Sequence, residues 1–132
     1  MLSKFDIKRD EKTLEKNSID ASIFRIVPSG VFAPSDKNEL VKFVNEVIKI
    51  KKENPNEKIS ISSRSAGTCM SGGSLTSDLL ISFTENLNNI IKIDKKNKTI
   101  EIEPGVYYRD MERETLKSGL ILPSYPASRE LC

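Results

Sequence analysis

The chain has 132 residues, of which 37% are hydrophobic and 30% charged, a size and composition typical of one soluble globular domain. Its net charge of +2 gives no argument for a polyanion, so nucleic acid is not expected as a partner. The chain contains no histidine, which excludes Ser-His triads, His general bases and His metal ligands from this polypeptide.

Two cysteines, Cys69 and Cys132, lack the spacing of metal ligands and suit a reducing compartment, so no metal site is expected. The N-terminus has no apolar core of signal-peptide length. No apolar run approaches the roughly 20 residues that a membrane span needs. The sequence therefore predicts a cytoplasmic protein without a transmembrane segment, and it leaves open peripheral association at the inner face of the membrane.

The first 17 residues are highly charged and are expected to form an N-terminal extension, with a short surface helix over residues 5–14. Residues 31–33 are predicted as a short strand that Pro34 closes. Between these segments, four apolar side chains are expected to be half buried: Ile23, Phe24, Ile26 and Val27.

A helix is predicted between Asp36 and Asn54. Asp36 can cap its first turn, and Glu39 follows at the spacing of a capping box. Two adjacent apolar stripes at helical spacing predict a broad face packed on a sheet: Leu40, Phe43, Val47 and Ile50, and next to them Val41, Val44 and Ile48.

The remaining predicted elements are short. Residues 58–62 and 78–83 are expected to form strands, residues 90–94 and 99–103 a hairpin, and a helix should run from Tyr108 to Leu116 and end near Gly119. The tail after Gly119 shows no regular pattern. A strand-helix-strand start predicts a parallel pair and the hairpin adds antiparallel character, so the expected fold class is α+β.

Residues 62–78, with the sequence SSRSAGTCMSGGSLTSD, contain three Gly, six Ser and two Thr between two apolar strands. Small residues let successive backbone N–H groups turn toward an anion, and hydroxyls add hydrogen bonds to phosphate oxygens. The loop is not a P-loop, because Gly73 stands where that motif needs Lys. It is not a dinucleotide-binding G-x-G-x-x-G either, because position 69 is Cys.

Three other interpretations of this loop exist. A Ser71 nucleophile fails the G-x-S-x-G pattern and lacks a His base. Cys69 could be a reactive thiol near Arg64. The loop could also be a flexible connector. Binding of a phosphate-containing ligand is the interpretation that the composition favours.

Three segments resemble the FAD-binding (PCMH-type) domain of the vanillyl-alcohol oxidase and p-cresol methylhydroxylase family: DASIFRIVPSGVFAPSDKNELVKFV, SRSAGTCMSGGS and KTIEIEPGVYYRDMERETLKSGLILPSYPAS. They follow one another along the chain in the order of that family. The resemblance runs from about residue 18 to residue 132 and is closest to the 2-hydroxy-acid (lactate or glycolate) dehydrogenase branch. It implies FAD as cofactor and hydride transfer to flavin. Thr68 stands where some members attach flavin through His, so the FAD is expected to be non-covalent.

The resemblance also implies which residues hold the cofactor. Arg64 would add charge or orient the loop. The loop residues near the diphosphate would be Ser65, Ala66, Gly67, Thr68 and Cys69, closed by Ser71, Gly72, Gly73 and Ser74. The residues near the ribityl chain or ring would be Pro126, Ala127, Ser128 and Cys132.

Compared with this family, residues 18–132 are expected to be the first part of a truncated FAD-binding domain. The small-molecule substrate and the catalytic residues would belong to a missing C-terminal part, so no catalytic residue is named. The chain alone is expected to be inactive and to self-associate through uncovered apolar surface. The alternatives are a family member acting on a sugar, an alcohol or a lipid intermediate, and a non-catalytic nucleotide- or phosphate-binding module.

Overall fold

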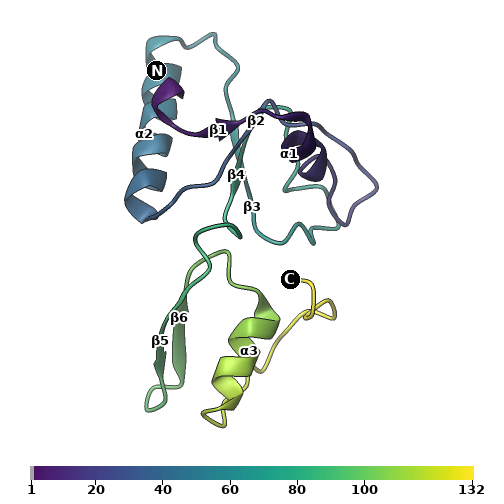
Figure 1. Ribbon diagram of the computed structural model, residues 1–132, viewed down its shortest axis with the longest axis vertical. Coiled ribbons are helices and arrows are strands. Elements are labelled where there is room, and N and C mark those ends of the chain that lie inside the picture. Colours follow the sequence, from purple (N-terminus) through teal and green to yellow (C-terminus); the bar gives the residue numbers. More distant parts are fainter. Residues whose placement is uncertain (1) are drawn as a thin grey trace.

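A computed structural model describes residues 2–132 and arranges them in two units (Figure 1). The first, which we call the sheet unit, contains η1 (Leu2–Lys4), β1 (Ile7–Lys8), α1 (Glu11–Lys16), β2 (Gly30–Phe32), α2 (Lys37–Glu53), β3 (Ile61–Arg64) and β4 (Leu79–Ser82). The second, which we call the hairpin unit, contains β5 (Ile90–Asp94), β6 (Thr99–Ile102), α3 (Tyr108–Leu116) and the tail to Cys132. The small mixed sheet with flanking helices confirms the α+β class.

The four-stranded sheet has the order β1-β2-β4-β3. β2, β4 and β3 are parallel, and β1 is antiparallel to β2. The strand-helix-strand start does make parallel strands, as predicted, but β2 and β3 are not neighbours because β4 lies between them. All four residues of β4 are buried, which is the pattern of a strand covered on both faces.

The core of the sheet unit is built on three phenylalanine rings. Phe32 from β2 stacks on Phe43 from α2 with ring centroids 4.2 Å apart, and Phe5 meets both rings edge to face. Leu79 and Ile81 of β4 and Val47 of α2 complete the cluster. The core therefore joins η1, the sheet and one face of α2.

Helix α2 begins and ends where its capping residues predict. Asp36 Oδ1 accepts a hydrogen bond from Glu39 N at 2.8 Å, and Asn54 is the C-cap. The Glu39 carboxylate turns back to Ser35 rather than to the backbone of Asp36. The broad apolar face was wrong in part: Val41 and Ile48 are 48% and 46% exposed, because strands of two to four residues cover only one stripe of the helix.

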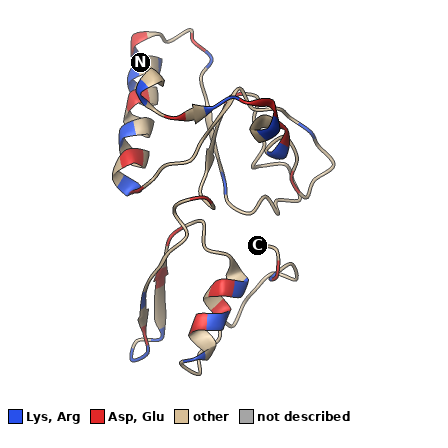
Figure 2. Ribbon diagram, in the orientation of Figure 1, with Lys and Arg blue, Asp and Glu red and all other residues tan. Residues whose placement is uncertain are grey.

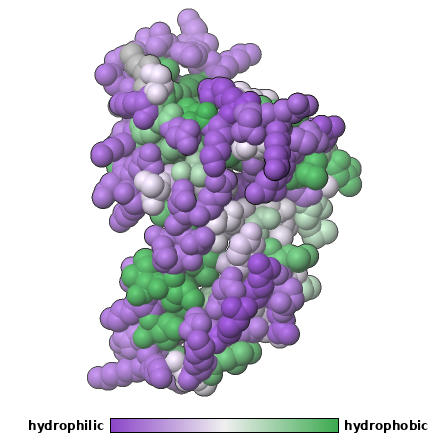
Figure 3. All heavy atoms as spheres, viewed as in Figure 1, coloured by the Kyte–Doolittle hydropathy of each residue, from purple (hydrophilic) through white to green (hydrophobic). Residues whose placement is uncertain are grey.

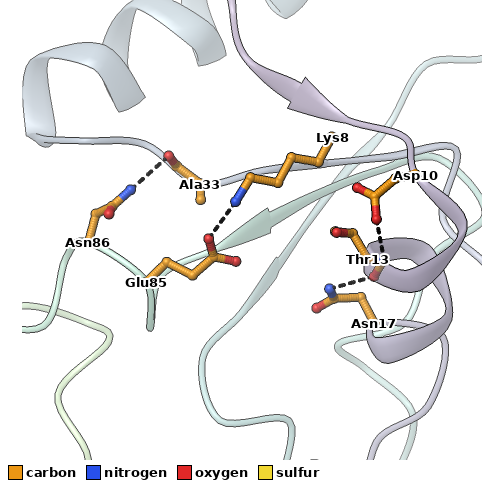
Figure 4. Close-up of polar contacts among 7 residues, drawn as sticks. All are labelled: Lys8, Asp10, Thr13, Asn17, Ala33, Glu85 and Asn86. Atoms are coloured by element: carbon orange, nitrogen blue, oxygen red, sulfur yellow. Dashed lines mark hydrogen bonds and ion pairs between the residues drawn. The ribbon is translucent and has the colours of Figure 1, made fainter.

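The expected helix over residues 5–14 was correct for residues 11–14 and wrong for residues 5–10. Phe5 enters the core, and the next residues pair with β2, with Ile7 opposite Phe32. A helix starts only at Glu11, where Asp10 Oδ1 accepts a hydrogen bond from Thr13 N at 3.0 Å (Figure 4). Burial of two apolar side chains on the sheet outweighs the local helical tendency of this charged segment.

The prediction that the apolar side chains of residues 23–27 are half buried was also wrong. Ile23 is 95% exposed, and Phe24, Ile26 and Val27 are 53%, 39% and 48% exposed. The segment is a loop at the edge of the sheet unit, closed by an isolated bridge between Ile19 and Arg25. Hydrophobic spheres at the right edge of the sheet unit and over part of the hairpin unit show how much apolar surface stays uncovered (Figure 3).

The remaining strand and helix predictions were largely correct. β3 begins at Ile61, three residues later than expected, since residues 57–60 lead into it without pairing as a strand. The hairpin of β5 and β6 is confirmed, as is α3, after which Gly119 takes a positive φ of 67°. None of the helices within residues 2–132 is long and apolar enough to cross a bilayer.

Residues 83–89 and 103–107 connect the two units. Gly105 N donates to Leu87 O at 2.8 Å, and a Cβ at Gly105 would lie 2.3 Å from Phe83 O, so only glycine fits this contact. On the other side of this connection, Lys8 Nζ contacts Glu85 at 2.8 Å and Asn86 Nδ2 donates to Ala33 O at 3.1 Å (Figure 4). The position of the hairpin unit is thus tied to the ends of β1, β2 and β4.

Candidate functional site

The glycine-rich loop, residues 65–78, connects β3 to β4, which are parallel neighbours. It must therefore return from the carboxyl end of one strand to the amino end of the next, and it does so without a helix. Between Arg64 and Asp78 it carries no charged residue and is drawn entirely in tan in Figure 2. Between these two residues, an ion bound by the loop would therefore contact backbone and hydroxyl groups.

A hollow of about 270 Å³ opens on the first half of the loop. No backbone N–H of residues 65–69 donates a hydrogen bond to another residue within 2–132. A run of five free amide donors on residues that line a hollow favours an anion, because each N–H can turn toward it at no cost to internal pairing. The lining residues are Ser63, Arg64, Ser65, Ala66, Gly67, Thr68, Cys69 and Ser74.

Two glycines of the loop have backbone conformations that other residues rarely adopt. Gly67 has φ +72° and Gly72 has φ +76°. A Cβ at Gly67 would lie 2.2 Å from Nη2 of Arg64, and one at Gly72 would lie 2.9 Å from the ring of Phe24. The loop is thus shaped by glycine at two turns and pressed against the side chains of its neighbours.

Arg64, at the end of β3, supports the loop. Its Nη1 donates to the carbonyl oxygen of Ile19 at 2.7 Å, while its guanidinium lies against Gly67. Burial lowers the pKa of Arg64, and the nearby Asp20 carboxylate acts in the opposite direction. Arginine remains charged in either case, so the loop keeps one positive charge at its start.

Asp20 was not predicted as a site residue. Its carboxylate accepts hydrogen bonds from Ser74 Oγ at 2.9 Å and from Ser22 N at 2.8 Å. Burial acts to raise the pKa of Asp20, but the hydrogen bonds from Ser22 and Ser74, together with Arg64, outweigh burial and lower it. The local signal was an Asp two residues before a Ser, typical of an Asx turn, but its contact with Ser74 spans 54 positions of sequence.

Cys69 lies at the hollow with its sulfur in polar contacts. Ser71 Oγ lies 3.3 Å from Cys69 Sγ, and Gly73 N donates to that sulfur at 3.3 Å. The hydrogen bonds with Ser71, followed by the one from Gly73, lower the pKa of the thiol. The thiolate fraction at neutral pH is therefore larger than that of an ordinary cysteine.

We expect Cys69 to react with iodoacetamide with a lower pH midpoint than an ordinary cysteine, because its pKa is lowered by hydrogen bonds. Ser71→Ala should move this midpoint upward, because it removes the hydroxyl that hydrogen-bonds the thiolate. Peptide-resolved mass spectrometry over a pH series separates Cys69 from Cys132. An unchanged midpoint in Ser71→Ala would show that the hydroxyl does not stabilise the thiolate.

The predicted residues of the tail form a second group. Ser128 O accepts hydrogen bonds from Leu131 N and Cys132 N, and Cys132 O accepts one from Tyr108 N at the start of α3. Pro126 and Ala127 are exposed. No hydrogen bond or ion pair between described residues joins this group to residues 64–74. The structure therefore brings the loop residues together and leaves the tail group on the hairpin unit.

Most of the chain matches a known family of sequences. The sequence profile of a family described as "FAD binding domain" matches residues 28–132. The chain is 29% identical over 109 residues to the glycolate oxidase subunit GlcD of Bacillus subtilis (strain 168), covering 82% of this chain and 22% of that protein. It is 33% identical over 88 residues to the D-lactate dehydrogenase of Anaerostipes hadrus, covering 65% of this chain and 18% of that one.

Solved structures share the fold at low sequence identity. An alkyldihydroxyacetonephosphate synthase superposes with a TM-score of 0.76 and 17% identity, over 99% of this chain and 28% of that chain. A p-cresol methylhydroxylase with substrate bound superposes with a TM-score of 0.70 and 21% identity, over 96% of this chain and 25% of that chain. The chain thus spans about a fifth of the length of the sequence relatives and about a quarter of these two structures.

Proposed function

We propose that the glycine-rich loop holds the diphosphate of FAD in a flavin-dependent oxidoreductase. The chain belongs to the FAD binding domain family, and FAD is its cofactor. The observation that carries the proposal is the run of unpaired amides at residues 65–69, which line a hollow of about 270 Å³. A diphosphate offers several acceptor oxygens, and backbone amides are donors suited to them.

The residues present fit this group. The diphosphate would meet the backbone of Ser65, Ala66, Gly67, Thr68 and Cys69, and Ser71, Gly72, Gly73 and Ser74 would close the loop around it. Ser74 would act through its backbone, since its hydroxyl already donates to Asp20. Arg64 would orient the loop from behind Gly67 while adding one positive charge.

When bound, the flavin supplies the electron-accepting chemistry of the oxidation. The contribution of this chain is to bind and orient one part of the cofactor. We further propose that the flavin is not covalently attached, because Thr68 lacks the imidazole nucleophile that such attachment would use. Pro126, Ala127, Ser128 and Cys132 would approach the ribityl chain or ring, a placement that rests on the family resemblance alone.

A 2-hydroxy acid such as lactate or glycolate is the substrate class that we propose. Two relatives named for glycolate and D-lactate support it, at 29% and 33% identity. The alternative within the family is a sugar, alcohol or lipid intermediate. The structural likeness to an alkyldihydroxyacetonephosphate synthase, at 17% identity, concerns the fold and does not separate these substrates. A non-catalytic phosphate-binding module is the alternative outside the family.

The substrate and catalytic groups would come from regions that correspond to the rest of the longer relatives. We propose that residues 18–132 are the first part of the FAD-binding domain, that residues 1–17 are an extension of it, and that the protein is cytoplasmic. The exposed apolar side chains of both units would be covered by those further regions, or by a second copy when the chain is alone. Among described residues these include Ile23, Phe24, Met70, Ile91 and Leu131.

The test is the visible spectrum of the natural gene product that contains these 132 residues. We expect a flavin spectrum, with all flavin released into the supernatant after acid precipitation because no covalent bond holds it. Reduction of the flavin by lactate or glycolate, measured as bleaching without oxygen, would support the substrate class. A correctly folded, colourless protein that takes up no added FAD would contradict the proposed function. Flavin that stays with the acid precipitate would contradict the non-covalent attachment.

A further inference from the structure

We propose that Asp20 is a positioning residue for the glycine-rich loop. Its carboxylate holds the loop in the conformation that binds the anion, without contacting the anion itself. This inference rests on the proposed function for its consequence in FAD binding. Its structural part concerns contacts between residues 19–24 and residues 64–74, two segments more than 40 positions apart in sequence.

Asp20 connects both segments through one carboxylate. Oδ1 accepts from Ser22 N at 2.8 Å, which fixes the side chain in its own turn. Oδ2 accepts from the hydroxyl of Ser74 at 2.9 Å, which fixes the second half of the loop. Ser74 is buried, with 8% of its surface exposed, so solvent cannot easily replace this contact.

The same segment also holds the beginning and the middle of the loop. Arg64 donates to Ile19 O at 2.7 Å, and Ala21 N donates to Gly67 O at 3.1 Å. The ring of Phe24 lies against Gly72. Residues 19–24 therefore clamp the loop at its start, near Gly67 and in its second half, where Asp20 bonds Ser74.

The loop needs such a clamp because it does little to hold itself. Its first five amides have no internal partner, so no ladder of hydrogen bonds opposes the backbone entropy of residues 65–69. An external clamp orders the loop before the ligand arrives, and a preordered site loses less entropy on binding. The clamp also leaves the amides free, which a clamp made through those amides would not.

Charge separates positioning from direct binding. A carboxylate beside an anion site repels the anion, so a purely electrostatic role for Asp20 would weaken binding of FAD. Asp20→Asn removes that charge. If charge alone mattered, this variant would bind FAD more tightly. If the carboxylate acts as the clamp, the variant should bind more weakly, since the amide has only one acceptor oxygen for two donors.

The experiment uses the natural gene product containing this chain, stripped of flavin, and titrates it with FAD. Asp20→Asn and Asp20→Ala should weaken FAD binding by roughly tenfold to a hundredfold, as expected for the loss of hydrogen bonds to a charged group. Ser74→Ala, which removes only the hydrogen bond between Ser74 and Asp20, should give a smaller loss of FAD affinity. Asp20→Glu tests whether a carboxylate one methylene longer restores part of the affinity.

Amide exchange of the flavin-free protein provides a readout independent of FAD. Exchange at Ala21 and Leu75, whose amides bond Gly67 O and Gly72 O, should accelerate at least roughly tenfold when the clamp is lost. The matched control is Asp94→Ala, which removes a carboxylate that also accepts two hydrogen bonds, from Asn97, but in the hairpin. It should change neither readout.

Asp20→Asn that binds FAD as tightly as the unmodified protein, or more tightly, would overturn the proposal. So would unchanged exchange at Ala21 and Leu75 in both Asp20 variants. If the unmodified protein itself binds no FAD, the proposed function fails, while the exchange data still decide whether Asp20 holds the loop. If Asp20→Ala does not fold, Asp20→Asn and Ser74→Ala decide the question.

Discussion

Substitution of Val for Gly67 or Gly72 is expected to lower FAD affinity at least roughly a hundredfold, because a β-branched residue does not tolerate the positive φ that both positions require. At Gly67 the new side chain would also displace the Arg64 guanidinium, whose Nη2 lies 2.2 Å from the Cβ position. At Gly72 it would press on the ring of Phe24 at 2.9 Å. Both changes should therefore displace the backbone of the loop beside the hollow.

The measurement is an FAD titration of the flavin-free natural gene product, with circular dichroism to confirm the fold. Gly119→Val is the matched control. Gly119 has a similar positive φ of 67°, but no atom lies within 4 Å of its Cβ position, and it follows α3 in the hairpin unit. It imposes the same kind of backbone strain away from the loop, so FAD affinity should not change. Retained affinity in both loop variants would show that the diphosphate binds elsewhere.

What the sequence predicted well was decided by neighbours in the chain. The ends of α2 follow from Asp36, whose carboxylate bonds an amide three residues away, and from Asn54. The hairpin follows from alternation across a short turn. The expectation that the loop binds an anion also rests on local composition, since small residues leave amides accessible, and it stays a prediction.

What the sequence did not predict depends on contacts between distant residues. No local pattern places β4 between β2 and β3, because that order is set by which buried faces meet. The pairing of Ile7 with Phe32 overrides a helical tendency in the same way. The role of Asp20 depends on a hydroxyl 54 positions away. Ile23 and its apolar neighbours are exposed, whereas hydropathy alone predicts that they are buried.

Phe43→Ala is expected to lower the free energy of unfolding by about 3 to 5 kcal/mol, the usual loss when a buried phenylalanine is truncated. Phe43 is fully buried, and its ring lies 4.2 Å from that of Phe32 and 5.1 Å from that of Phe5. Truncation would leave a cavity between η1, the sheet and α2, the three parts that this cluster joins. Urea unfolding of the natural gene product, followed by circular dichroism, measures the loss.

Val41→Ala on the same helix is the matched control, because Val41 is 48% exposed and should contribute less than about 1 kcal/mol. Phe43→Leu fills most of the space and should lie between the two, so it remains informative if the alanine variant does not fold. A loss for Phe43→Ala no larger than that for Val41→Ala would mean that α2 does not pack on the sheet through this ring. Because β3 and β4 carry the two ends of the glycine-rich loop, a core that holds these strands also fixes the span that the loop must bridge. Partial loss of this packing should therefore weaken FAD binding even where the loop sequence is unchanged.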